Sequence, residues 1–158
     1  MGVFTYEFDH VSTRLSPHRM FKALVVDSDH VFPKVYPQVF KKLENISGNG
    51  GPGTIKKANL AGHGHQVNHI DVSDTEKLEF GYTIVEGDAL KDHLEKIHNH
   101  IKIVEGAHGG CVVKSTAKYF TKGNAEFKEE YAIQSKDKYA GLFKAVENYL
   151  LENPHLYN

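Results

Sequence analysis

The sequence has a single cysteine, no long hydrophobic run and almost no net charge. One cysteine excludes an intramolecular disulfide and favours a reducing compartment. No stretch approaches the roughly 20 apolar residues of a membrane span, and the N-terminus shows no signal peptide. The formal net charge of −1 gives no general electrostatic reason to bind nucleic acids or anionic membranes. We therefore expect a cytoplasmic protein that binds no membrane and does not bind nucleic acid strongly.

The chain is most simply one domain, residues 1–158, which is long enough to bury a core. Its C-terminal segment, Lys128 to Glu152, predicts a long helix. From Tyr139 onward the apolar residues recur at intervals of three and four, which is typical of a helix with one buried face. Before that point, polar residues such as Gln134 and Lys138 interrupt the apolar surface. We expect the helix to pack at its C-terminal end and to border a cavity at the other.

The rest of the chain predicts one strand, two short helices and then six strands. Residues 4–9 alternate between aromatic and polar, which is typical of a half-buried strand. Ser16 and Pro17 supply a cap and a first-turn proline for a helix that ends near residues 27–29, and Val31–Tyr36 predicts a second one. The later strands follow one another without a helical crossover, so the sheet should be antiparallel. Their ranges are Val39–Ile46, Thr54–Leu60, His65–Val72, Leu78–Glu86, Leu94–Val104 and Cys111–Phe120.

A curved antiparallel sheet can wrap a single helix, but seven strands make a wide sheet for one helix. The space beneath the polar half of the helix would then stay partly unfilled, which makes it a candidate ligand pocket. Alternation turns Phe80, Tyr82 and Ile84 to the inner face of one strand, and Asn99 and Ile101 to that of the next. The Tyr82 hydroxyl and the Asn99 amide need hydrogen-bond partners there, and a ligand can supply them.

A glycine-rich loop lies before the third strand and superficially resembles a phosphate-binding loop. Such a loop needs a lysine directly after its last glycine and a helix to follow, whereas Thr54 begins a strand here. We therefore predict a hairpin of fixed shape, whose amides and Lys56 could contact an anion only weakly. The loop residues are Gly48, Asn49, Gly50, Gly51, Pro52 and Gly53.

Two His-x-His pairs, His63/His65 and His98/His100, could each place two imidazoles on one face of a strand, as some zinc sites do. No third ligand or open position is identifiable from the sequence. Alternation also puts His98 and His100 on a solvated face. We therefore expect no metal and no cofactor.

The sequence offers no clear catalytic group. Glu95, Glu147 and Tyr149 could act as an acid–base group, but their spacing alone does not bring them together. Lys114 falls with Thr116 on the solvent face of its strand, which does not support a buried Schiff-base lysine. The residues by themselves therefore specify no reaction.

Segments distributed from one end of the chain to the other carry a specific family resemblance. They are Met1–Glu7, Phe21–Leu24, Gly48–Lys57, Glu86–Asp88, Leu94–Ile97, Lys118–Gly123 and Val146–Leu150. Together they resemble the plant pathogenesis-related proteins of class ten, the family of the major birch pollen allergen. The resemblance implies an α+β helix-grip fold: a seven-stranded curved antiparallel sheet around a long C-terminal helix, with two short helices in a V. That order agrees with the one predicted from the residues.

The resemblance also implies an internal hydrophobic cavity that binds amphipathic plant metabolites or hormones, such as flavonoids, cytokinins, sterols or fatty acids. The expected role is that of a defence-linked or stress-linked carrier or storage protein. The small molecule would be the partner of a monomer or weak dimer. The positions that match the family's cavity lining are Leu24, Phe40, Leu60, His65, Val67, His69, Phe80, Tyr82, Ile84, Asn99, Ile101, Gln134, Lys138 and Leu142.

Some members of this family are reported as ribonucleases, which is the main alternative function. The positions that match the residues usually implicated are Lys56, Glu95, Glu147 and Tyr149. The chain departs from the family pattern at Ser47, which replaces an acidic residue, and in a short, histidine-rich segment over residues 59–69. Ligand preference is therefore not transferred from other members. Abscisic-acid receptors share the fold, but their Ser-Gly-Leu-Pro-Ala gate is absent, so phosphatase inhibition is not expected.

Overall fold

The computed structural model describes residues 2–12, 14–62 and 64–158. It contains a seven-stranded sheet in the order β1-β7-β6-β5-β4-β3-β2, and every neighbouring pair is antiparallel. The predicted sheet is confirmed, and the first strand of the chain pairs with the last. The strands are β1 (Val3–Ser12), β2 (Phe40–Ser47), β3 (Ile55–Leu60), β4 (His65–Asp74), β5 (Glu79–Gly87), β6 (Leu94–Glu105) and β7 (Cys111–Thr121).

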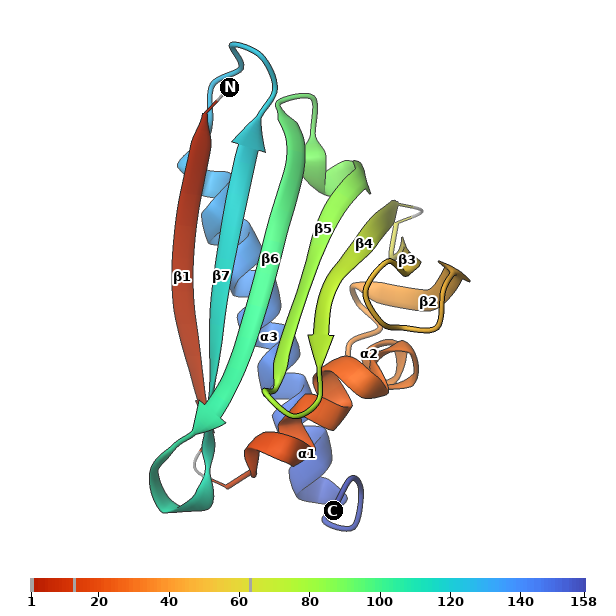
Figure 1. Cartoon of the computed structure of the whole chain (residues 1–158), viewed down its shortest axis with the longest axis vertical. Coiled ribbons are helices and arrows are strands. Elements are labelled where there is room, and N and C mark those ends of the chain that lie inside the picture. The colour runs from red at the N-terminus through yellow and green to blue at the C-terminus, as the bar shows by residue number, and fades with distance from the viewer. Residues whose placement is uncertain (1, 13, 63) are drawn as a thin grey trace.

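The long helix α3 (Glu129–Glu152) runs along one face of the sheet, behind it in Figure 1. Two short helices, α1 (Pro17–Phe21) and α2 (Ser28–Val35), lie at the end of the sheet that also holds the C-terminal half of α3 (Figure 1). A π-helical turn, η1 (Lys22–Val26), joins the short helices. Short 3₁₀ turns, η2 (Asp88–Leu90) and η3 (Ala107–Gly109), precede β6 and β7. The predicted arrangement of one long and two short helices is therefore confirmed.

The two short helices begin where their capping residues allow. Ser16 caps α1, because its hydroxyl accepts a hydrogen bond from the Arg19 amide at 3.3 Å. The second helix begins at Ser28, earlier than the predicted start at Val31. The reason is that the carbonyl of Asp27 already accepts the Val31 amide at 2.9 Å, which closes a full helical turn before Val31.

The buried apolar residues form two clusters, one at each end of α3. The larger cluster joins α1, η1 and α2 to the C-terminal half of α3, including Leu142, Phe143 and Val146. The smaller cluster includes Tyr119 of β7 and Ala132 in the N-terminal half of α3. The middle of the sheet is covered less completely, and the candidate site lies there. No helix in the described part of the chain is long and apolar enough to cross a membrane.

Candidate ligand-binding cavity

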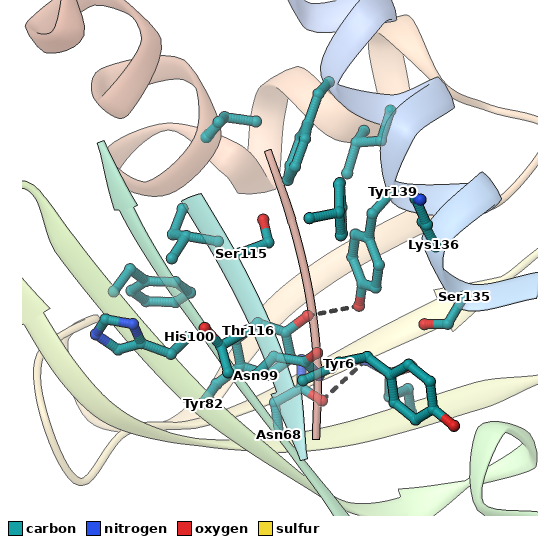
Figure 2. Close-up of a pocket in the computed structure, with 18 of the residues that line it drawn as sticks. Tyr6, Asn68, Tyr82, Asn99, His100, Ser115, Thr116, Ser135, Lys136 and Tyr139 are labelled. Atoms are coloured by element: carbon teal, nitrogen blue, oxygen red, sulfur yellow. Dashed lines mark hydrogen bonds between the residues drawn. The ribbon is translucent and has the colours of Figure 1, made fainter. Parts of the chain in front are cut away.

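A cavity of about 300 Å³ lies between the sheet and the N-terminal half of α3. This volume is at the lower end of the range for small-molecule sites. Figure 2 shows its wall, with side chains from the strands facing others from α3 such as Ser135, Lys136 and Tyr139. The helix residues of the wall run from Glu129 to Phe143, so Leu142 and Phe143 belong both to the wall and to the larger apolar cluster. The predicted asymmetry of the helix is therefore found, but its packed and cavity-bordering parts overlap.

Strand register explains which side chains form the wall. Neighbouring strands place Ile70, Tyr82, Asn99, Ala117 and Tyr6 directly opposite one another across β4, β5, β6, β7 and β1. All of them line the cavity. Directly opposed residues in an antiparallel sheet share a face, so this is one continuous inward row. This row thus carries two phenols and one amide among smaller or apolar groups.

A second inward row lies two residues away along the strands. It pairs Phe80 with Ile101, Ile101 with Ser115, and Ser115 with Phe8. These four residues also line the cavity. The second row is therefore mostly apolar, with the Ser115 hydroxyl as its polar group.

A hydrogen bond crosses from the sheet to the helix. The hydroxyls of Tyr82 on β5 and Tyr139 on α3 lie 2.5 Å apart (Figure 2). Burial raises the pKa of the Tyr82 phenol well above its usual value, and the neighbouring Tyr139 raises it further. Tyr82 therefore stays protonated and neutral at physiological pH.

Three buried polar atoms of the wall have no hydrogen-bond partner within the described part of the chain: Gln66 Oε1, Asn99 Nδ2 and Ser115 Oγ. Gln66 does use its other amide atom, because its Nε2 donates to Asn68 Oδ1 at 3.0 Å. An unsatisfied buried polar group costs about 1–3 kcal/mol. All three residues line the cavity, but these three atoms themselves are buried away from its open space.

The predicted lining is found in part. Seven predicted residues lie in the wall, on β2, β5, β6, η1 and α3: Leu24, Phe40, Phe80, Tyr82, Asn99, Ile101 and Leu142. Two others, Gln134 and Lys138, line a separate hollow of about 200 Å³, together with Tyr131 of α3. Tyr119 and Ser135 line both spaces.

The predicted placement of His65, Val67 and His69 in the wall is wrong. In β4 the buried positions are Gln66, Asn68 and Ile70, one residue out of step with the prediction. A shift of one residue along a strand moves every side chain to the opposite face. The two inward amides hydrogen-bond each other, which makes their burial tolerable, whereas outward His65 pairs with the exposed Glu86 at 2.8 Å.

Leu60 and Ile84 also lie outside the wall. Leu60 is half-buried against the larger apolar cluster. Ile84 shares the inward face of β5 with Tyr82, but it lies two residues further along the strand and is buried in the smaller cluster. The prediction for Ile84 was correct about its face and wrong about its position along the strand.

The four ribonuclease candidates have different neighbours, and no contact joins them among the described residues. Lys56 forms an ion pair with Asp29, while Glu95 is exposed on β6. The Tyr149 ring lies 5.5 Å from the Lys34 ammonium. The structure therefore does not assemble these four residues into one site.

Glu147, the fourth candidate, is buried between α3 and β1. Its Oε1 lies 3.3 Å from His10 Nε2 and 3.5 Å from Lys144 Nζ. Burial opposes ionisation, but the Ser12 hydroxyl and the Lys144 ammonium outweigh it and hold the pKa of Glu147 below its usual value. These contacts indicate a carboxylate that joins the helix to the sheet.

The glycine-rich loop is the hairpin between β2 and β3, and no helix follows it. The buried Thr54 closes the loop, because its hydroxyl accepts the Gly50 amide at 2.9 Å. Gly48 has a φ of +94°, and a Cβ there would lie 2.5 Å from Thr54 Oγ1. The glycine therefore permits a close turn, and the loop is not built like a phosphate cradle.

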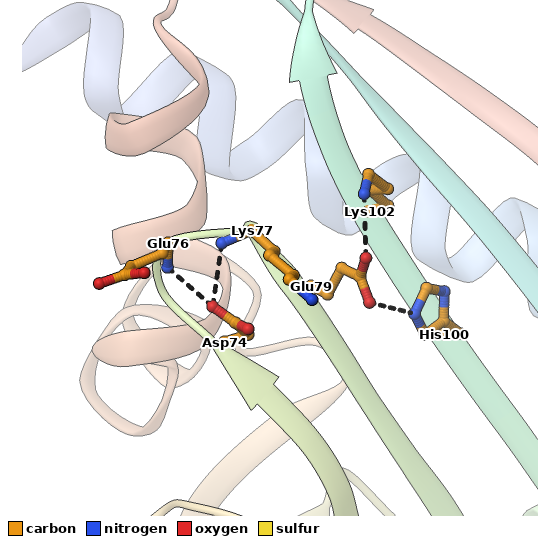
Figure 3. A network of polar contacts seen from close by, with 6 residues as sticks. All are labelled: Asp74, Glu76, Lys77, Glu79, His100 and Lys102. Carbon is orange, nitrogen blue, oxygen red and sulfur yellow. Dashed lines mark hydrogen bonds and ion pairs between the residues drawn. The ribbon is translucent and has the colours of Figure 1, made fainter.

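The histidines of the two His-x-His pairs are not arranged like the ligands of a zinc site. His63 is outside the described residues, and His98 lies 3.2 Å from Asp71. His100 lies 3.6 Å from Glu79, which also accepts a hydrogen bond from Lys102 at 2.9 Å (Figure 3). That bond to Lys102 holds the pKa of Glu79 below its usual value. The described residues contain no group of three or more His, Cys, Asp or Glu positioned to hold a metal ion.

Sequence reasoning missed several lining residues, among them Tyr6, Gln66, Ser115 and Tyr139. For Ser115 a usable signal existed, because its neighbours on β7 had been assigned to the solvent face. Tyr139 was counted only as part of the packed stripe of the helix. For Gln66, polar character argued against an inward position, so no local signal pointed to it.

Comparison with known proteins identifies the family. The model of the pathogenesis-related protein Bet v 1 family matches residues 1–153. The major allergen Pru av 1 of Prunus avium is 47% identical over 161 residues, covering 100% of both chains. The major strawberry allergen Fra a 1.08 of Fragaria ananassa is 46% identical with the same full coverage, 100% of each chain.

Solved structures agree with this assignment. Ara h 8.0201 superposes with a TM-score of 0.86 at 37% identity, covering 96% of this chain and 99% of that one. Norcoclaurine synthase from Thalictrum flavum superposes with a TM-score of 0.72 at 22% identity, covering 96% of this chain and 87% of that one, and thus shares the fold. On the family model, the full-length relatives and the fold together, this chain belongs to the pathogenesis-related protein Bet v 1 family.

Proposed function

We propose that this protein binds an amphipathic small molecule in the cavity beneath α3 and acts as a carrier or storage protein linked to defence or stress. The observation that supports this proposal is the cavity of about 300 Å³, whose wall is mostly apolar and has a few polar groups. Such a combination is typical of small-molecule sites, because apolar burial supplies affinity and polar groups fix orientation. The candidate ligands are flavonoids, cytokinins, sterols and fatty acids. We place this role in the cytoplasm, which the free, buried Cys111 supports.

The expected affinity is moderate. A ligand that buries about 200 Å² of apolar surface gains roughly 5 kcal/mol, and hydrogen bonds to the wall add to this. Part of the gain is lost to immobilisation of the ligand. We therefore expect dissociation constants of about 1–100 µM, or roughly −8 to −5.5 kcal/mol.

Filling the cavity tests the proposal. Ala117 lies between Asn99 and Tyr6 in the inward row, so Ala117→Phe would occupy the centre of the cavity. We expect this variant to bind the neutral fluorescent probe N-phenylnaphthylamine at least about tenfold more weakly than the unmodified protein, about 1.4 kcal/mol. Fluorescence titration measures the affinity.

Val85→Phe is the matched control, because it adds an aromatic ring at an exposed position of β5. Binding should be unchanged in this variant. Equal probe affinity in Ala117→Phe and the unmodified protein would show that the probe binds elsewhere. Failure of the probe and of all four ligand classes to bind at about 100 µM would refute the proposal.

A further inference from the structure

The hairpin between β2 and β3 exposes an asparagine that directly precedes a glycine. Asn49 is the only asparagine of the sequence followed by glycine, and its side chain is exposed. Asparagine is a chemically labile residue, because the backbone nitrogen of the next residue can attack its side-chain amide. Glycine has no side chain to hinder this attack. A Cβ built on Gly50 would meet no atom within 4 Å, so the surrounding chain does not shield this position either.

The side-chain carbonyl of Asn49 lies against the backbone that follows it. Its Oδ1 accepts a hydrogen bond from the Gly51 amide at 3.2 Å. Attack on the side-chain amide carbon places negative charge on this oxygen, and a donor already aimed at it stabilises the transition state. The contact with Gly51 therefore favours reaction at Asn49.

The attacking nitrogen, in contrast, is held by Thr54. The Gly50 amide donates to Thr54 Oγ1 at 2.9 Å, and Thr54 is only 1% exposed. Ring closure replaces the hydrogen on this nitrogen with the side-chain carbon of Asn49, so the new bond must form in the direction of the N–H bond. In the structure that direction points at Thr54. The hydrogen bond to Thr54 must therefore break before the nitrogen can attack, which slows the reaction.

We propose that Asn49 is a site of spontaneous deamidation, and that the hydrogen bond from Gly50 to Thr54 keeps this reaction slow in the folded protein. The Gly50 nitrogen bonds to Asn49 Cγ, the Cγ–Nδ2 bond breaks, and ammonia leaves with the proton of the Gly50 amide. Water then opens the cyclic imide at either carbonyl and gives aspartate or isoaspartate. Water is the only co-reactant that these steps consume.

The product differs from the original hairpin in two ways. A carboxylate replaces a neutral amide, which adds one negative charge to the formal net charge of −1. Isoaspartate also inserts a carbon atom into the main chain of the loop, beside the hydrogen bonds to Thr54 and Gly51. The modified protein is therefore a more acidic form that anion exchange can separate from the original one.

The first experiment compares Thr54→Val with Thr54→Ser. Valine keeps the shape of the side chain and removes the acceptor, whereas serine keeps the hydroxyl. After incubation at neutral pH, peptide mass spectrometry measures the converted fraction of Asn49, and labelling by an isoaspartyl methyltransferase identifies isoaspartate. Thr54→Val should convert at least about fivefold faster than the unmodified protein, and Thr54→Ser should stay within about twofold of it. Equal rates in Thr54→Val and the unmodified protein overturn the role of Thr54.

Two other asparagines serve as internal controls in the same samples. Asn45 and Asn124 are also exposed, but Ile46 and Ala125 follow them. Both should remain unconverted while Asn49 reacts, because a side chain on the next residue hinders the attack. Conversion of these two residues as fast as that of Asn49 would overturn the assignment of a specific site.

The second experiment needs no variant and decides the matter if circular dichroism shows that Thr54→Val is not folded. The unmodified protein is incubated in native buffer and in guanidinium chloride, beside a synthetic peptide of residues 45–57. The native protein should convert at least about fivefold more slowly than the peptide, and the denatured protein should match the peptide. Equal rates in the native protein and the peptide overturn the restraint by the fold. No conversion of Asn49 in any sample overturns the site itself.

Discussion

The two halves of α3 differ in what they contact, although they belong to one continuous helix. In the C-terminal half, Leu142, Phe143 and Leu150 are at most 4% exposed. In the N-terminal half, Ile133 is 54% exposed, and Ala132 is its buried apolar residue. The C-terminal half thus holds the domain together, and the N-terminal half covers a hollow. Residues of α3 beyond Phe143 can therefore be changed without altering the lining of the cavity.

The ends of the helix show the same contrast. Arg19 of α1 donates to the carbonyl oxygens of Leu150 and Asn153 at 3.0 and 3.1 Å. These contacts satisfy carbonyl groups that a helix leaves unpaired at its C-terminus. At the other end, Lys128 makes no capping hydrogen bond through its side chain. The cavity-bordering end is therefore the less firmly held one.

The largest expected effect tests the packing contrast directly. Leu150→Ala should lower the free energy of unfolding by about 2–5 kcal/mol, because it leaves a cavity in the larger cluster. Ile133→Ala, at an exposed position, should change it by about 0.5 kcal/mol or less. Urea denaturation measures both. Equal losses in the two variants would show that the halves contribute alike.

An intermediate effect concerns the buried carboxylate in the C-terminal half. The folded-state pKa of Glu147 lies below its ordinary value of 4.5, so its contribution is complete above that pH and is lost as the pH falls through the folded-state pKa. Glu147→Gln should cost about 1–3 kcal/mol at neutral pH, and the difference from the unmodified protein should shrink in acid.

Stability measured by urea denaturation at a series of pH values checks this expectation for Glu147. Glu129→Gln, at the exposed start of α3, is the matched control and should leave the pH dependence unchanged. A loss for Glu147→Gln that is constant from neutral to acidic pH would show that the charge of this residue is not responsible.

The smallest expected effect concerns the hydrogen bond that joins α3 to the sheet at the cavity. Tyr139→Phe removes the hydrogen bond to Tyr82 and should cost about 1 kcal/mol. Hydrogen exchange should become faster in the N-terminal half of α3 and stay unchanged around Val146. Tyr131→Phe is the control, because Tyr131 faces the smaller hollow and leaves that bond intact. Uniformly faster exchange along the whole helix would contradict the division into halves.

The fold could be predicted because local signals agreed with the tertiary arrangement. The apolar stripe after Tyr139, the cap at Ser16 and the turn residues between strands all act over a few residues. Alternation also gave the inward faces of β5 and β6, where Phe80 and Ile101 are apolar. In β4 the inward side chains at 66 and 68 are amides, and only their mutual hydrogen bond makes burial favourable. Periodicity alone carries no information about such a pair.

The extent of the cavity was beyond sequence reasoning for a different reason. Which inward residues border the hollow depends on where the two apolar clusters end along each strand. Ile84 and Tyr82 share a face, yet Ile84 is buried among Leu94 and Tyr119 while Tyr82 meets Tyr139. That outcome is decided by the path of α3 across the sheet, and no local pattern records this path.

The pairing of β1 with β7 determines when the cavity can close during synthesis. The sheet is complete only when β7 has been synthesised and can pair with β1. The helix α3 follows β7 in the chain, so it leaves the ribosome later still. Contacts between segments so distant in the chain form slowly. The nascent chain therefore has no enclosed cavity until α3 has packed against the complete sheet.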